Sequence, residues 1–211
     1  TKKSYSMHGE DVFLIEYFHS KNKGFYVDVG CYHPFEGNNT QSLYNKGWSG
    51  MNIDISELSI SLFNFARKRD INIFSGISNK KENLQMFYRK EINMLNTFDE
   101  KLANIHFKNG YSTKIISSNT LNFFLENNNI KSEIDFLNID VEGKELEVLK
   151  SLNVSKYNPV LICIEIHNKE KMYDENLSYL KNNDVYNFLL KHNYKIVWNN
   201  KYSFIFEKNN I

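Results

Sequence analysis

GFYVDVGCYHPFEGNNT, residues 24–40, contains the turn that decides the fold. The apolar run at 25–29 ends on Gly30, as a buried strand does before a tight turn. A dinucleotide-binding loop would continue with more glycines, because they bring the backbone close to a pyrophosphate. Here the polar and aromatic run CYHP follows instead. The stretch predicts a strand and turn that hold a nucleoside without a pyrophosphate, and it disfavours a nicotinamide dehydrogenase.

Outward from this turn, strand-like and helix-like segments alternate along the chain. Helices are expected where apolar residues recur at helical spacing, and strands where short apolar runs lack a polar face. The expected helices are 10–18, 41–47, 56–69, 119–127, 141–152 and 185–192. The expected strands are 25–29, 51–55, 71–78, 111–117, 134–140 and 160–167, with a final hairpin at 194–200 and 201–208 and a loop or flap at 83–97.

This alternation predicts an α/β fold with a mostly parallel sheet between helices and an antiparallel strand at one edge. Thr40 is expected to cap the second helix, and the basic residues after Ala66 are expected to close the third. We find no linker, repeat or composition shift, so 1–211 is expected to be a single domain.

Composition and charge exclude several classes of function. The 26 basic residues nearly balance the 25 acidic ones, so the chain has no strong field to hold nucleic acid or an anionic membrane. No apolar stretch is long enough to span a bilayer, and the first residues lack a signal-peptide core. Cys31 and Cys163 are far apart in the sequence and are expected to be reduced, in a cytoplasmic protein. Heavy use of Asn, Lys and Ile indicates an AT-rich bacterial genome, and the sequence does not decide between a monomer and a homo-oligomer.

Acidic residues end four of the apolar runs, and a histidine joins them. In an open parallel sheet, ligands bind outside the carboxyl ends of the strands. A lone carboxylate there can simply cap the next helix. Residues two apart in a strand share one side of the sheet, however, so two pairs of this kind predict four groups that converge on one rim. The pairs are Asp140 with Glu142, and Glu165 with His167.

Asp54 ends the strand that follows the glycine turn, about 25 positions beyond Gly30. That spacing suits a carboxylate that accepts both hydroxyls of a ribose. A lone glycine at the turn would let the backbone approach a ribose or an amino-acid tail, as S-adenosylmethionine requires.

Several motifs in this order resemble the FkbM family of S-adenosylmethionine-dependent methyltransferases. The likeness covers nearly the whole chain, and the segment at 136–152 is its most distinctive part. The motifs are HGED (8–11), GFYVDVGCYHP (24–34), NNT (38–40), LYNKGWSGMNIDI (43–55), ISN (77–79), LNTF (95–98), FLNIDVEGKELEVLKSL (136–152) and IEIH (164–167).

The resemblance implies a class I methyltransferase fold, a Rossmann-like three-layer sandwich with a seven-stranded sheet whose last strand is antiparallel. It implies Asp28 and Gly30 at the methionine end of the cofactor, Asp54 at the ribose, and adenine between the neighbouring residues Ile77 and Ser78. Family members often carry an acidic residue at position 79, where this chain has Asn. The remaining cofactor-binding residues expected from the family are His8, Cys31, Asn39, Thr40, Ile55 and Gly76.

The implied reaction is methyl transfer to a hydroxyl, for which a base or a Lewis acid is needed. The expected catalytic residues are Asp140, Glu142, Glu165 and His167, with His167 favoured as the base for its ordinary pKa near 6.5. Its alternative is a structural histidine. Asp140, Glu165 and His167 are also a credible ligand set for a divalent cation such as Mg²⁺ or Mn²⁺.

The acceptor is expected to be a carbohydrate, a nucleotide-activated sugar or a unit of a capsular or other surface polysaccharide, and this choice follows from the family. The segment 87–107 is rich in aromatic and amide side chains that suit a sugar, or it is a surface insertion with its own small core. The alternatives are a small natural-product hydroxyl, a phosphorus-linked acceptor, and a non-catalytic binding domain. Nucleic-acid methylation is disfavoured because no basic cluster with interleaved aromatic residues occurs.

Overall fold

The computed structural model describes residues 4–131, 134–166, 177–200 and 202–209. The helices are α1 (Glu10–Tyr17), α2 (Gln41–Asn45), α3 (Glu57–Ala66), α4 (Glu100–His106), α5 (Leu121–Asn127), α6 (Glu145–Lys150), α7 (Val154–Tyr157), the 3₁₀ helix η1 (Ser178–Asn182) and α8 (Asp184–Lys191). The strands are β1 (Phe25–Val29), β2 (Ser49–Asp54), β3 (Ile71–Phe74), β4 (Gly76–Ile77), β5 (Glu82–Tyr88), β6 (Ser112–Asn119), β7 (Phe136–Ile139), β8 (Leu161–Glu165), β9 (Tyr194–Asn199) and β10 (Ser203–Lys208).

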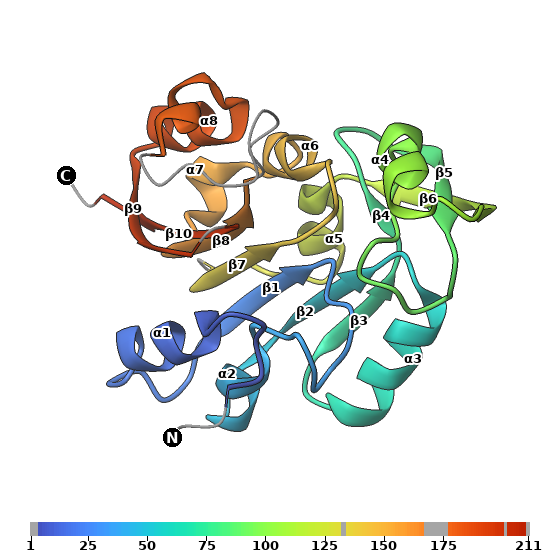
Figure 1. The fold of residues 1–211 in the computed structure, drawn as a ribbon. Helices are drawn as coiled ribbons and strands as arrows, with labels where there is room; N and C mark the ends of the chain where they lie inside the picture. The colour runs from blue at the N-terminus through green and yellow to red at the C-terminus, as the bar shows by residue number, and fades with distance from the viewer. Residues whose placement is uncertain (1–3, 132–133, 167–176, 201, 210–211) are drawn as a thin grey trace.

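Seven strands form one sheet in the order β3-β2-β1-β7-β8-β10-β9 (Figure 1). Within this sheet, the neighbouring strands β3, β2, β1, β7 and β8 pair in parallel. Strand β10 pairs antiparallel with both β8 and β9. This arrangement confirms the predicted Rossmann-like methyltransferase fold, but the antiparallel strand β10 lies between β8 and β9 and not at the edge where it was expected. The chain order reverses between β1 and β7, so a ligand crevice is expected at the carboxyl ends of these two strands.

Helices cover both faces of the sheet (Figure 1). On one face, α5 to α8 pack over apolar residues that include Val27, Val29 and Ile139. On the other, α1 and α2 pack over Tyr26 and Phe136. Because successive strand residues point to opposite faces and both faces are covered, these strands appear in the sequence as unbroken apolar runs.

Two helix boundaries differ from prediction for identifiable reasons. Thr40 precedes α2 but does not cap it with its side chain, because its hydroxyl donates to the Asp28 carboxylate at 3.0 Å. α3 begins as expected, with the Ser56 hydroxyl accepting from the Ser59 N–H, but it ends at Ala66. The basic residues that follow therefore do not form its last turn, and Arg67 is fully buried.

The segment after β3 corrects two predictions. The expected strand at 71–78 is two strands, and β4 belongs to a separate sheet of order β4-β6-β5. The expected loop at 83–97 begins as a strand, since β5 pairs antiparallel with β6 from Glu82 to Tyr88. Phe87, Ala103 and Phe107 form a small core beneath α4, as the insertion alternative expected.

The structure also bears on two further expectations, the state of the two cysteines and the presence of a bilayer-spanning helix. Cys31 and Cys163 are buried and are not joined in a disulfide. Among the described residues, no helix has both the length and the hydropathy to cross a bilayer.

Candidate active site

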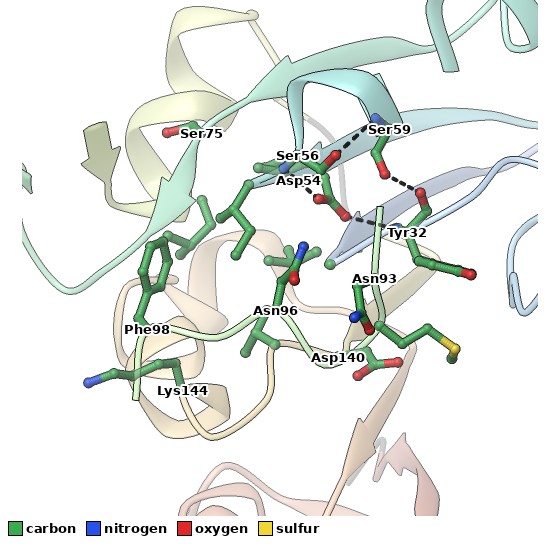
Figure 2. Close-up of a pocket in the computed structure, with 17 residues that line it drawn as sticks. Tyr32, Asp54, Ser56, Ser59, Ser75, Asn93, Asn96, Phe98, Asp140 and Lys144 are labelled. Carbon is green, nitrogen blue, oxygen red and sulfur yellow. Dashed lines mark hydrogen bonds between the residues drawn. The ribbon is translucent and has the colours of Figure 1, made fainter. Parts of the chain in front are cut away.

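A cavity in the form of a cleft, partly open to solvent, lies where the sheet order reverses. Its floor contains the ends of β1, β2 and β7, at Gly30, Asp54 and Asp140. The start of α3 and the loop 93–98, which precedes α4, complete the wall (Figure 2).

The Asp54 carboxylate is held in place by two backbone N–H groups. Its Oδ2 accepts the N–H of Tyr32 and its Oδ1 accepts the N–H of Ser56, both at 2.8 Å. Burial raises the pKa of Asp54 to about 6, although these backbone hydrogen bonds lower it. A carboxylate oxygen has two lone pairs, so each oxygen can still accept one hydroxyl. This geometry suits a vicinal diol such as that of a ribose.

The turn after β1 packs closely against the backbone that follows β7 and is hydrogen-bonded to α3. Gly30 has φ +79°, and a Cβ at this position would lie 1.7 Å from the backbone oxygen of Asp140. Tyr32 also adopts a left-handed conformation, with φ 55°, and its carbonyl accepts the hydroxyl of Ser59. The glycine is thus required by the close approach of β1 and β7, which is a reason that the sequence alone did not reveal.

The loop 93–98 forms the wall opposite the strand ends. Asn93, Met94, Asn96 and Phe98 all line the cavity (Figure 2). Phe98 packs against the backbone of Gly76, where an added Cβ would lie 2.9 Å from the ring. The segment 87–107 was predicted to cover an acceptor pocket. Part of it, the loop 93–98, lines the same cavity as Asp54.

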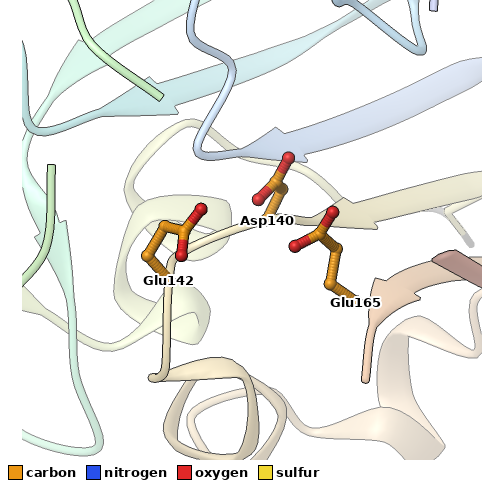
Figure 3. A group of neighbouring side chains, drawn as sticks. All are labelled: Asp140, Glu142 and Glu165. Atoms are coloured by element: carbon orange, nitrogen blue, oxygen red, sulfur yellow. The ribbon is translucent and has the colours of Figure 1, made fainter. Parts of the chain in front are cut away.

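Three carboxylates converge beyond the end of β7, from two neighbouring strands of the sheet (Figure 3). Asp140, Glu142 and Glu165 each offer one oxygen, and these oxygens lie within 4.8 Å of one another. Burial, followed by the charges of Glu165 and Glu142, raises the pKa of Asp140 well above its ordinary range. Like charges at this separation repel one another, which disfavours the ionised form of Asp140.

Glu142 joins the cluster through a strained turn. Its φ is 48° and that of the following glycine is 100°, so α6 starts at Glu145 and not directly after the strand as predicted. The Thr97 hydroxyl donates to the Glu142 carbonyl at 2.8 Å, and His106 Nε2 lies 3.7 Å from Glu142 Oε2. The loop 93–98 and α4, which lie beside the three-stranded sheet, therefore contact Glu142 of the carboxylate cluster as well as forming part of the cavity wall.

The model of the Methyltransferase FkbM domain matches residues 28–196. The chain belongs to the FkbM methyltransferase family. A search of curated proteins found no match. The family supports methyl transfer in general and suggests use of S-adenosylmethionine, and the mostly parallel seven-stranded sheet is consistent with a Rossmann-like methyltransferase fold.

In this FkbM domain, the sequence-predicted cofactor residues fall into two groups. The residues that line the cavity are Gly30, Asp54, Ile55 and Ile77, joined by the predicted catalytic residue Asp140. The residues that do not line it are His8, Asp28, Cys31, Asn39, Thr40, Gly76 and Ser78. His167 lies outside the described residues.

The residues that do not line the cavity have other contacts. His8 is exposed, with its ring beside Tyr202. Cys31 packs against α3, and the Asn39 amide donates to Asn138 at 2.9 Å. The Ser78 hydroxyl donates to Glu82, and Gly76 gives Phe98 its space.

Asp28 is one position short of the strand end and points to the face covered by α1 and α2. It is fully buried and accepts from Asn138 at 2.8 Å, Thr40 at 3.0 Å and Asn38 at 3.3 Å. Burial raises its pKa, while these hydrogen bonds and the charge of Arg67 lower it. In this structure, Asp28 ties the loop 38–40 to the sheet beneath the cavity.

The sequence predicted the segment 87–107 as a cover, but it did not single out most of the polar residues of the wall. Those not assigned individually to the cofactor or to catalysis are Tyr32, Ser56, Ser59, Asn93, Asn96 and Lys144. Ser56 stands out as an N-cap in the sequence, so its place at the cavity was recoverable from its neighbour Asp54. The loop asparagines carry no signal, because the chain is rich in Asn throughout.

Proposed function

We propose that the chain is a single S-adenosylmethionine-dependent O-methyltransferase domain that acts on a sugar hydroxyl. The observation that carries this proposal is one cavity with two carboxylate sites. Asp54 offers free lone pairs at the end of β2, and Asp140 brings the three-carboxylate cluster to the end of β7. A nucleoside with a reactive tail requires both features.

The cofactor would lie across the ends of β1 and β2. Asp54 accepts the two ribose hydroxyls, and the apolar surface at Ile77 and Phe98 receives the adenine. The tail passes the Gly30 turn toward Asp140. Binding of the ribose favours the ionised form of Asp54 and thus lowers its pKa in the complex.

Methyl transfer from a sulfonium is an in-line displacement by the acceptor oxygen. The new O–CH₃ bond forms as the S–CH₃ bond breaks, the electron pair of the broken bond returns to sulfur, and the hydroxyl proton leaves the oxygen. The cluster of Asp140, Glu142 and Glu165 takes this proton, since a carboxylate with a raised pKa is a better base near neutral pH. Holding the acceptor oxygen in line with sulfur supplies much of the remaining rate.

A divalent cation is a second role for the same carboxylates. Their oxygen atoms are ligands that Mg²⁺ and Mn²⁺ accept, and two members of the predicted set, Asp140 and Glu165, belong to the cluster. When bound, such a cation would acidify the acceptor hydroxyl. Dialysis against a chelator should then abolish activity and Mn²⁺ should restore it, whereas full activity of the metal-free enzyme removes the cation from the proposal.

The choice of a sugar acceptor follows the family resemblance of the motifs and a composition typical of an AT-rich bacterial genome. Amide and aromatic groups at the cavity, such as Asn93 and Tyr32, suit the hydroxyls and faces of a sugar ring. The preferred acceptors are a nucleotide-activated sugar and a capsular or surface polysaccharide unit.

Calorimetry with S-adenosylhomocysteine tests the cofactor, and labelled S-adenosylmethionine with an acceptor panel tests the reaction. We expect binding, followed by transfer to a nucleotide sugar. Without binding heat, the methyltransferase proposal is wrong. Binding with transfer only to a natural-product hydroxyl or a phosphorus-linked compound would correct the acceptor, and binding without transfer to any of them would favour a non-catalytic domain.

A further inference from the structure

Two aromatic rings from opposite ends of the chain meet beside the end of β8. His8 is exposed, and its ring centroid lies 6.0 Å from that of Tyr202, with the two ring planes inclined by 35°. The Tyr202 carbonyl accepts the N–H of Ile166 at 3.0 Å, directly after Glu165, the last residue of β8. Neither ring lines the cavity, so the proposed cofactor does not account for this aromatic pair.

A buried carboxylate holds the two halves of the aromatic pair together. Glu10 is 2% exposed, and its Oε2 accepts the N–H of His8 while its Oε1 accepts the amide of Asn200, both at 3.0 Å. The Asn200 Oδ1 in turn accepts the N–H of Tyr202 at 2.7 Å. A buried carboxylate is costly unless it is hydrogen-bonded, and here its bonds fix the backbone on both sides. The aromatic pair is therefore held in place from both chain ends.

The aromatic pair lies next to the carboxylate cluster. Ser203 pairs with Glu165 across β10 and β8, and Tyr202, which precedes Ser203, therefore stands at the carboxyl end of β8. Burial is the main cause of the raised pKa of the Cys163 thiol, and the charges of Glu10 and Glu165 add to it. Glu10 and the carboxylate cluster thus share one neighbourhood at this end of the sheet.

The N-terminal segment that carries His8 also reaches the rim of the cavity. Met7, the preceding residue, is 59% exposed. Three side chains surround the position that a Cβ would take at Gly37, each at 3.7 Å from it: Met7, Tyr32 and Met94. Because Tyr32 and Met94 line the cavity, Met7 borders it and connects it to the aromatic pair.

Rings beside carboxylates suit a carbohydrate. The faces of His and Tyr side chains present apolar surface to the C–H groups of a sugar, and carboxylate oxygens accept its hydroxyls. An in-line displacement also requires the acceptor oxygen to approach the methyl carbon from the side opposite sulfur. The proposed cofactor lies across the ends of β1 and β2, so the acceptor belongs on the β8 side of Asp140.

We propose that the acceptor sugar lies against the rings of His8 and Tyr202, with its reacting hydroxyl directed at Glu165. This inference rests on the proposed function, because it assumes a carbohydrate acceptor and a cofactor in the cavity. The cofactor occupies the β1–β2 side of the carboxylate cluster and the sugar occupies the β8 side. His8 is then an acceptor-binding residue and not the cofactor-binding residue that the sequence predicted.

The test measures binding of UDP-glucose, UDP-N-acetylglucosamine and GDP-mannose by calorimetry, with the full chain saturated with S-adenosylhomocysteine. Wild-type protein should bind at least one of these nucleotide sugars. Tyr202→Leu and His8→Leu should each weaken that binding about tenfold, as expected for the loss of an aromatic contact. Tyr202→Phe, which keeps the ring, should retain most of the affinity. The affinity for S-adenosylhomocysteine should be nearly unchanged in every variant.

His19→Leu is the matched control. His19 is exposed like His8, but it lies beyond the other end of α1, where its Nδ1 is 3.0 Å from the Glu16 carbonyl oxygen. This variant should bind the nucleotide sugars as wild-type protein does. Retained binding of S-adenosylhomocysteine shows that a variant is folded, and thermal unfolding provides a second check.

The outcomes separate the two proposals. If wild-type protein does not bind S-adenosylhomocysteine, the proposed function fails and this inference fails with it. If it binds S-adenosylhomocysteine but none of the nucleotide sugars, the sugar site is wrong while methyl transfer to another acceptor stands. If the folded Tyr202→Leu and His8→Leu variants keep the wild-type affinity, or if Tyr202→Phe loses as much as Tyr202→Leu, the rings do not hold the acceptor and the methyltransferase proposal is unaffected.

Discussion

Replacing Asp54 by Asn should make the protein more stable at neutral pH while removing cofactor binding. The pKa of Asp54 is raised from an ordinary value of 3.8 to about 6, chiefly by burial. A folded state with the higher pKa binds the proton more tightly than the unfolded state, so stability is greatest below pH 3.8 and falls as pH rises to about 6. At about 1.4 kcal/mol for each pH unit between these values, the ionised carboxylate costs about 3 kcal/mol at pH 7.5.

Asp54→Asn removes this cost but gives up one hydrogen bond. The two carboxylate oxygens accept from Tyr32 and Ser56 separately, and an amide has only one accepting atom. That loss is about 1–2 kcal/mol. The variant should therefore be about 1–2 kcal/mol more stable than wild type at pH 7.5, and this advantage should disappear at pH 4.5.

Urea denaturation of both proteins at pH 4.5, 6 and 7.5 measures the difference, and groups unaffected by the change cancel in it. Asp99→Asn is the matched control. Asp99 accepts two backbone N–H groups through Oδ1 alone, so an amide can keep both bonds at this half-buried helix start. A variant at position 54 that is less stable than wild type at pH 7.5, or a difference that does not change with pH, would refute the reasoning.

Three further substitutions test other parts of the structure. Gly30→Ala should lower the free energy of unfolding by about 4 kcal/mol or prevent folding, because its Cβ would overlap the backbone oxygen of Asp140. Gly110→Ala, also at positive φ but in open space, should lower it by only about 1–2 kcal/mol, as measured by urea denaturation. Glu165→Gln should lower kcat about 10²–10⁴-fold with little change in S-adenosylhomocysteine affinity, and unchanged kcat would exclude the carboxylate cluster as the base. Arg67→Met should cost about 3–5 kcal/mol because it leaves buried carboxylates uncompensated, while the exposed Arg69→Met should cost far less; equal losses on thermal or urea unfolding would contradict this.

The main sheet could be predicted because its strands are buried on both faces. The strands β1, β2, β7 and β8 each appear as a short apolar run, and burial on both sides leaves no polar alternation to blur their limits. The small sheet was harder to predict. β5 is exposed along much of one face, so its alternating residues occur within a polar segment that has no clear period.

The convergence of carboxylates was predicted, but by a geometry that does not apply. The sequence argument placed Asp140 and Glu142 in a strand, where residues two apart share a side. The strand ends at Ile139, and a left-handed turn at Glu142 and Gly143 brings the second carboxylate back toward the first. Such a turn depends on contacts far away in sequence, including the Thr97 hydroxyl, and no local pattern specifies it.

Asp28 shows the limit of reading a motif from its residue types. An aspartate just before the glycine turn invites a role in ligand binding, yet strand alternation turns it to the face opposite Val27 and Val29. There it meets Asn38, Thr40 and Asn138, and the charge of Arg67 favours its ionised form. The sequence shows which residues share a face, but only the packed helices decide what that face touches.

In the proposed reaction, the total amount of charge at the Asp140 cluster decreases as the methyl group is transferred. A sulfonium is a cation, and transfer of its methyl group leaves a neutral thioether. The acceptor proton neutralises one carboxylate of the Asp140 cluster, so a positive and a negative charge disappear together at this site. The same burial that raises the pKa of Asp140 therefore favours the forward transfer, and it destabilises the folded protein for the same reason. The cost in stability and the gain in reactivity have one physical origin.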